Sequence, residues 1–117
     1  MHESLGQRIR KKREEKQLGL REMARQLSIS PAYLSRVETD EERTPPGEQT
    51  LRAIAEALNE NFDDLMHLAG RVPSDVGDMI RRDPDLPHFL RTANQKGFTG
   101  KRLGELLKEG QLLKRRR

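Results

Sequence analysis

The side chains best suited to chemistry in this chain lie close together, between residues 30 and 36. A guanidinium such as that of Arg36 can donate two hydrogen bonds to guanine O6 and N7, which discriminates between bases by about 1–3 kcal/mol. It could instead contact a phosphate or form a surface ion pair. Tyr33 is the only tyrosine, and the helical spacing predicts that it points outward. Its ring could stack on a thymine methyl group while its hydroxyl reaches a phosphate, or it could pack on the helix expected over residues 48–59.

The other residues of this segment are small. Ser30 and Ser35 could hydrogen-bond bases or phosphates, and Pro31 and Ala32 would allow a helix to approach another surface closely. A major groove is wide enough to admit such a helix, and its base edges carry a distinctive pattern of donors and acceptors. The segment is therefore a candidate surface for reading DNA.

Two short helices joined by a tight turn position these residues. Apolar residues recur at helical spacing in both halves of residues 20–38, namely at Met23, Ala24 and Leu27 and then at Leu34 and Val37. Ser30 can accept a hydrogen bond from a free amide of the next turn, and Pro31 suits a first helical position. The spacing predicts helices over 20–27 and 31–38 that cross steeply, with the second presenting one face outward.

The rest of the chain is also predicted to be helical. In the first 70 residues we expect helices over 4–16, 48–59 and 62–69, with a proline-containing loop at 39–47 and no strand. These predict an all-α, five-helix domain over residues 5–70. The apolar pattern of residues 71–113 predicts a helical extension with helices over 74–82, 86–96 and 100–109. Ser74 could cap the first of these. Residues 114–117 are expected to be a frayed basic tail.

Charge is unevenly distributed along the chain. Residues 5–36 hold nine Lys or Arg and three Glu, a net charge of +6, whereas residues 37–70 have a net charge of −7. Residues 71–117 return to +6. A cationic face followed by an acidic one suits a protein that meets a polyanion with one side only, although charged helices can also simply be solvated.

Several classes of function are not expected. The absence of cysteine excludes disulfides and thiolate metal sites, and no apolar run is long enough to span a membrane. His2, His67 and His88 lie far apart without the acids that a zinc site needs. No nucleophile with a matching histidine and acid, and no phosphate-binding glycine pattern, can be identified. We therefore expect neither an enzyme nor a cofactor, and a cytoplasmic, nucleoid-associated protein.

Over about 65 residues, the sequence resembles the lambda-repressor/Cro family of helix-turn-helix regulators, also called the xenobiotic-response-element family. The order, spacing and class of the residues all agree. The matching residues are Leu5-Gly6, Ile9-Arg10, Arg13, Arg21 to Ala24, Ser30, Tyr33 to Glu38, Pro45-Pro46, Thr50-Leu51, Ile54-Ala55 and Ala57-Leu58. Residues 71–117 fall outside the resemblance.

The resemblance implies a dimer on double-stranded DNA, with helix 31–38 in the major groove and the start of helix 20–27 against a phosphate. It also implies a structural ion pair between Arg13 and Glu38. Two departures affect the phosphate contacts. Gly19-Leu20 replaces the usual Thr or Ser followed by Gln, so that backbone amides and Arg21 would have to bind the phosphate. The acids of residues 39–42 would repel phosphates unless they point away, which leaves Arg43 or Thr44 for contact from this loop.

Two functions are consistent with these observations. The favoured one is a sequence-specific DNA-binding transcriptional regulator, a dimeric repressor of a palindromic operator. The alternative is an antitoxin-like or adaptor module that binds a protein partner through residues 71–113. The apolar residues between 76 and 107 could complete the core, form a dimer interface or bind a partner, and we favour the dimer interface because two-fold symmetry doubles the bases read.

Overall fold

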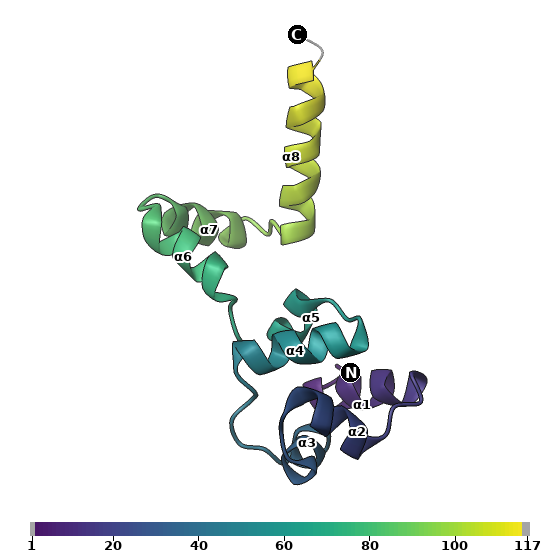
Figure 1. Ribbon diagram of the computed structural model, residues 1–117. Coiled ribbons are helices and arrows are strands. Elements are labelled where there is room, and N and C mark those ends of the chain that lie inside the picture. Colours follow the sequence, from purple (N-terminus) through teal and green to yellow (C-terminus); the bar gives the residue numbers. More distant parts are fainter. Residues whose placement is uncertain (1, 116–117) are drawn as a thin grey trace. The chain divides into compact units, whose positions relative to one another are not determined.

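The computed structural model describes residues 2–115, with the backbone alone at 112, 113 and 115 (Figure 1). These residues form eight α-helices and no strand. Contacts within the chain divide it into two units, the first ending at Ser74 and the second beginning at Asp75. The sequence had suggested a boundary after Gly70. No helix in the described part of the chain is long and apolar enough to cross a membrane.

Five helices form unit 1, and their bounds agree with the prediction to within one residue at each end. They are α1 (Leu5–Glu15), α2 (Leu20–Leu27), α3 (Pro31–Glu38), α4 (Glu48–Leu58) and α5 (Phe62–Leu68). Helices α1 and α2 each contact α3 and α4, and α4 also contacts α5. This all-α arrangement confirms the predicted fold class.

Every helix of unit 1 contributes to one core. Its largest fully buried side chains are Ile9 of α1, Met23 of α2, Leu34 of α3, Leu51 and Ile54 of α4, and Leu65 and Met66 of α5. Burial of a side chain of this size contributes about 1.5–3 kcal/mol, so the core is a main source of favourable free energy for folding. One face of each helix is thereby fixed toward the interior.

The turn between α2 and α3 sets the direction of α3. Ser28 adopts a left-handed conformation (φ 57°, ψ 41°) that ends α2, and the amide of Ile29 donates to the carbonyl of Ala24 at 3.0 Å. Two residues later, Ser30 caps α3, with Pro31 at its first position. A left-handed residue followed by an extended cap reverses the chain within three residues, so the two helices cross instead of running parallel.

Close packing joins α1 to the end of α3. A Cβ atom added at Gly6 would lie 2.4 Å from the carbonyl oxygen of Val37 and 2.5 Å from that of Glu38. Neither backbone oxygen can move without shifting α3 as a whole. Glycine at this position therefore allows α1 to approach the C-terminal end of α3.

Unit 2 consists of α6 (Ser74–Arg82), which begins at the last residue of unit 1, α7 (Leu86–Gln95) and α8 (Gly100–Arg115). Helix α8 is longer than predicted, because Gly110 does not end it and Lys114 and Arg115 continue it. The expected frayed tail is therefore wrong for these two residues, and Arg116 and Arg117 lie outside the described residues. Ser74, the predicted cap, is the first residue of α6, and its hydroxyl donates to Glu48 at 2.7 Å.

Unit 2 buries little apolar surface. Among the side chains described in this unit, Ala93 alone is buried. Large apolar side chains that are exposed in the described part of this unit are Val76, Met79, Phe89, Leu90, Phe98, Leu106 and Leu107. The described side chains of unit 2 therefore form no core comparable to that of unit 1.

Candidate nucleic-acid interface

The outer face of α3, which comprises Pro31, Ala32, Ser35 and Arg36, lies opposite the face that packs in the core. Pro31, Ala32 and Arg36 are exposed and Ser35 is half-buried, whereas Leu34 and Val37 are buried. The helix is thus held by one side and accessible on the other. The small residues in its first turn leave the backbone close to any surface that approaches it.

Ser30 begins α3. Its Oγ atom accepts a hydrogen bond from the amide of Tyr33 at 3.0 Å, which satisfies one of the free donors of the first turn. The residue is exposed, and its hydroxyl retains a proton that it can donate. Ser30 can therefore cap the helix and bond a phosphate or a base at the same time.

Tyr33 lies less far outward than the sequence predicted. It is half-buried and packs against the core of unit 1. Part of the ring therefore packs on the core of unit 1 instead of facing outward. The Cζ atom of Arg36 lies 6.0 Å from the centroid of the ring, at the outer limit of a cation–π contact.

Arg36 forms an ion pair within the domain. Its Nε atom donates to Oε2 of Glu42 at 2.9 Å. The side chain of Arg36 nevertheless remains 49% exposed, against 28% for Glu42. Because a guanidinium carries five N–H donors, one bond to Glu42 leaves most of them for another ligand.

The first turn of α2 is the expected phosphate contact. Gly19 occupies the N-cap position and provides no side-chain hydrogen bond to the helix. The leading amides of a helix carry partial positive charge and bind anions readily. Arg21 is exposed in the same turn, so both expected contributors to a phosphate contact are on the surface.

The acidic loop, residues 39–47, directs its three acids at groups of the domain itself. Asp40 accepts from the hydroxyl of Ser4 at 2.6 Å and from the amide of Gly6 at 3.1 Å. Glu41 accepts from the hydroxyl of Thr39 at 2.8 Å, and Glu42 accepts from Arg36. Arg43 and Thr44, which follow them, are exposed.

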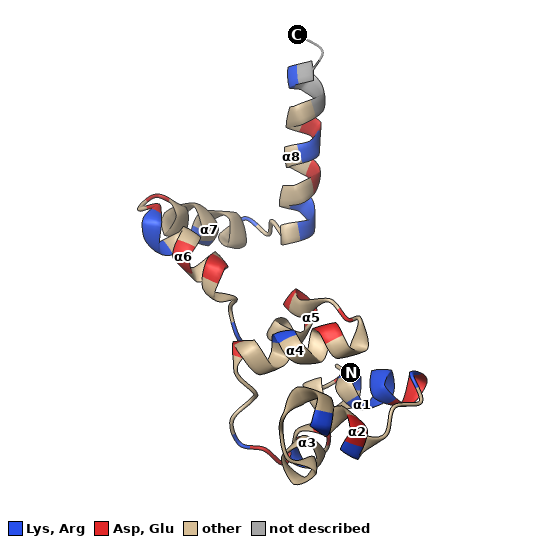
Figure 2. Cartoon of the chain, viewed as in Figure 1, with Lys and Arg blue, Asp and Glu red and all other residues tan. Residues whose placement is uncertain are grey.

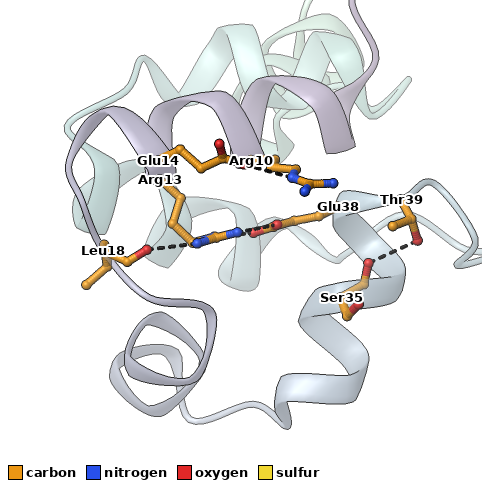
Figure 3. Close-up of polar contacts among 7 residues, drawn as sticks. All are labelled: Arg10, Arg13, Glu14, Leu18, Ser35, Glu38 and Thr39. Carbon is orange, nitrogen blue, oxygen red and sulfur yellow. Dashed lines mark hydrogen bonds and ion pairs between the residues drawn. The ribbon is translucent and has the colours of Figure 1, made fainter.

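The expected ion pair between Arg13 and Glu38 is present (Figure 3). Arg13 donates from Nε and Nη2 to the two carboxylate oxygens at 2.7 and 2.9 Å, and from Nη1 to the carbonyl of Leu18 at 2.8 Å. The hydrogen bond to Glu38 raises the pKa of Arg13, although burial opposes it. The pair joins α1 to the end of α3 and so fixes the helix that carries Arg36.

Other cationic side chains of α1 and α2 also have acidic neighbours (Figure 2). Arg10 pairs with Glu14 at 2.8 Å, and Arg25 pairs with Glu22. The hydrogen bond from Arg25 lowers the pKa of Glu22. Exposed pairs of this kind contribute about 0–1 kcal/mol, so a phosphate can replace the acid at little cost.

Sequence reasoning missed the residues that hold the acidic loop. Glu42, Asp40 and Arg71 each form hydrogen bonds to residues that are not their neighbours in the sequence. Arg71 donates to the carbonyls of Pro46 and Pro45 at 2.9 and 2.7 Å. The signal for Glu42 was an acid placed six residues after Arg36. No comparable pattern in the sequence points to Arg71.

This arrangement of α2 and α3 is that of a helix-turn-helix protein. A family model described as a helix-turn-helix domain matches residues 6–71. The chain belongs to this helix-turn-helix family, of the lambda-repressor/Cro type that its motifs had suggested.

The proteins to which the chain is similar include two transcriptional regulators and a solved structure of a protein complex. It is 36% identical over 70 residues to the HTH-type transcriptional repressor RghR of Bacillus subtilis, an alignment that covers 60% of this chain and 51% of that protein. The chain thus spans about half the length of that relative. It is 32% identical over 111 residues to the HTH-type transcriptional regulator DdrOP3 of Deinococcus deserti, with 84% of each covered. A structure of the SinR protein/SinI protein complex matches with 25% identity and a TM-score of 0.50, covering 94% of this chain and 97% of that chain.

Proposed function

We propose that this chain is a sequence-specific DNA-binding transcriptional regulator that reads the major groove with α3. The observation that carries the proposal is the outer face of α3, which presents Arg36 and a small first turn to solvent while its other face is held in the core. The relatives RghR and DdrOP3 bear the names of a transcriptional repressor and a transcriptional regulator, which supports the same function.

The proposed contacts fall into two groups. Arg36 and Ser35 read base edges, together with the outward part of Tyr33, while Pro31 and Ala32 allow close approach. Phosphates are bound by the first amides of α2 and, at the edges of the interface, by the side chains of Arg21, Ser30 and Arg43. Phosphate contacts fix the position of the domain on the duplex, and base contacts select the sequence.

We further propose that the chain acts as a homodimeric repressor in the cytoplasm, associated with the nucleoid, and binds a palindromic operator. A single α3 spans only a few base pairs, so two related copies are needed for a long site. The exposed apolar side chains of unit 2 supply a surface for the second copy.

Selection of binding sites from random double-stranded DNA, at stated salt, tests the regulator. We expect a palindromic preferred sequence. Arg36→Ala should weaken binding to that sequence by about 5-fold or more, the value of one guanidinium–guanine pair, while its far-UV circular dichroism matches the parent. Equal binding by variant and parent in a mobility-shift titration would show that α3 does not read the bases.

Arg36→Lys is the matched control. Lysine keeps the positive charge but loses the planar fork that holds a guanine with two bonds. We therefore expect Arg36→Lys to keep most of the affinity for unrelated DNA while losing preference at the base that Arg36 reads. A full loss of affinity for all sequences would instead mark Arg36 as a phosphate contact.

The second candidate function is a protein-interaction module that acts through residues 71–113. It is favoured by the exposed apolar side chains of unit 2 and by the similarity to a structure in which SinR is complexed with SinI. A partner that copurifies at fixed stoichiometry, together with no preference for any DNA in the selection, would favour this candidate over the regulator.

Truncation tests the dimer. Removing residues 86–117 deletes most of the exposed apolar surface of unit 2, so we expect the mass measured by light scattering to fall from that of a dimer to that of a monomer. Unit 1 has its own core, and its circular dichroism per helical residue should persist. An unchanged dimer mass would assign the interface to the first 85 residues.

A further inference from the structure

The ion pair between Arg36 and Glu42 has a particular geometry. The bond joins Nε of Arg36 to Oε2 of Glu42 at 2.9 Å, so it occupies the N–H nearest the aliphatic stem. The terminal Nη1 and Nη2 groups carry the other four N–H donors. The guanidinium also lies over the Tyr33 ring, with its Cζ atom 6.0 Å from the centroid. The side chain is thus restrained by its bond to Glu42 and lies near the Tyr33 ring, while 49% of it remains exposed.

Glu42 is itself held in place through the backbone of the acidic loop. The amides of Glu41 and Glu42 both donate to the carbonyl of Arg36, at 2.8 and 3.3 Å. Asp40, in a left-handed conformation with φ 60°, bonds the start of α1. The loop therefore returns to the end of α3 and places a carboxylate beside the last turn of that helix.

The far end of the loop is anchored as well. Arg71 donates to the carbonyls of Pro45 and Pro46 at 2.7 and 2.9 Å. A loop held at both ends fixes the position of its side chains. Because the pair has a single bond and Arg36 is 49% exposed, it restrains the direction of the guanidinium more than it blocks access to it.

We propose that Glu42 is a specificity-determining residue of this regulator, which holds the Arg36 guanidinium in the orientation that reads a base edge. The proposal rests on the proposed function. An unrestrained arginine reaches any nearby phosphate and gains affinity for all sequences alike, whereas an arginine held by a carboxylate loses that pair when it turns away. The charge of Glu42 also repels phosphates. Glu42 therefore lowers general affinity and raises discrimination between bases.

Neutral variants of two adjacent acids separate orientation from charge. Glu42→Ala removes the bond to Arg36, and Glu41→Ala removes the same charge from the same loop but leaves that bond. Glu42→Gln removes the charge and keeps an oxygen that can accept from Nε. The titration of Arg36→Ala first identifies the base at which this variant loses its preference. Each full-length variant, and Arg36→Ala, is then titrated against the selected operator and against operators altered at that base.

The measured quantity is the ratio of affinities for the selected and altered operators. We expect Glu42→Ala to lower this ratio about 5-fold or more, toward that of Arg36→Ala, because one guanidinium–guanine pair discriminates by at least that factor. Glu41→Ala and Glu42→Gln should raise affinity for both operators and keep the ratio of the parent. In the Arg36→Ala background, Glu42→Ala should leave the ratio unchanged.

The outcomes that contradict the inference are distinct from those that contradict the regulator. If Arg36→Ala abolishes the preference but Glu42→Ala keeps it, or if Glu42→Ala and Glu41→Ala change it equally, Glu42 does not orient Arg36 and the regulator stands. If the parent shows no preference among DNA sequences, the proposed function is wrong and this inference with it.

Discussion

At the residue scale, Glu38 is the single buried charged residue in the described part of the chain, with 6% of its surface exposed. Its carboxylate is bound by two nitrogens of Arg13. A charge taken out of water is tolerated only where it is paired and hydrogen-bonded. The pair joins two helices that are 25 residues apart at these positions, so its loss would affect the placement of α3 as well as stability.

We expect Arg13→Met to lower the free energy of unfolding by about 3–5 kcal/mol, because it leaves a buried carboxylate without a partner. The double variant Arg13→Met, Glu38→Leu should recover most of that loss, since two apolar side chains leave no buried charge. Urea unfolding followed by circular dichroism measures both. Equal destabilisation by the single and double variants would contradict this account.

The same pair sets an expectation for pH. A group whose pKa is raised on folding keeps its contribution at low pH and loses it only as the pH rises through the folded-state pKa. For Arg13 that pKa lies above the already high value of a guanidinium. The contribution of Arg13 to stability should therefore stay constant through neutral pH. The difference in free energy of unfolding between the parent and Arg13→Met, as far as it comes from this arginine, should not fall between about pH 6 and 9.

At the scale of the helix, Ser30 serves both stability and the proposed contact with DNA, and two substitutions separate these roles. Ser30→Ala removes the acceptor for the amide of Tyr33 and should cost about 1 kcal/mol of unfolding free energy. Ser30→Asp keeps an acceptor at the cap, so stability should be retained, but its charge would face a phosphate and weaken binding. Unfolding and mobility-shift titrations measure the two effects. Equal DNA affinity for Ser30→Asp and the parent would remove Ser30 from the interface.

Most of the helices could be predicted because their ends carry local signals. Ser30-Pro31 defines the start of α3, and Asn61 caps α5 by accepting from the amide of Asp64 at 2.9 Å. Helix α8 was predicted to end at residue 109, but it continues through Gly110 to Arg115. A glycine ends a helix only where the next residues leave it. Leucines at 112 and 113 continue the apolar pattern beyond that glycine, and the helix continues with them.

The acidic loop could not be predicted in the same way. Its conformation depends on Asp40 in a left-handed conformation and on bonds to Ser4 and Gly6, which lie more than 30 residues earlier. Local propensity does not determine such contacts. The sequence indicated that Arg36 was a candidate for base contact. Its partner Glu42 could not be predicted, because their contact depends on how the loop folds back to α3.

At the scale of the whole molecule, the positive charge of residues 5–36 should appear as salt dependence. Each phosphate neutralised adds about 0.9 to the slope of log affinity against log salt concentration. We expect Arg21→Ala to reduce that slope by about 0.9 for each protomer, with little change in base preference. Lys108→Ala removes the same charge from α8 and should leave the slope unchanged. Equal slopes for Arg21→Ala and the parent would exclude the proposed phosphate contact.

Unit 1 has a full core, whereas one of the described side chains of unit 2 is buried. This difference affects how stability depends on protein concentration. In the proposed homodimer, unit 2 gains apolar contacts from the second copy and is stabilised by mass action. Heating a dilute sample should then melt unit 2 before unit 1, and a concentrated sample should bring the two transitions together. In a cell, the amount of assembled protein would then rise faster than the amount synthesised. A modest fall in synthesis would then lower the occupancy of the operator more sharply than it would for a protein that binds as a monomer.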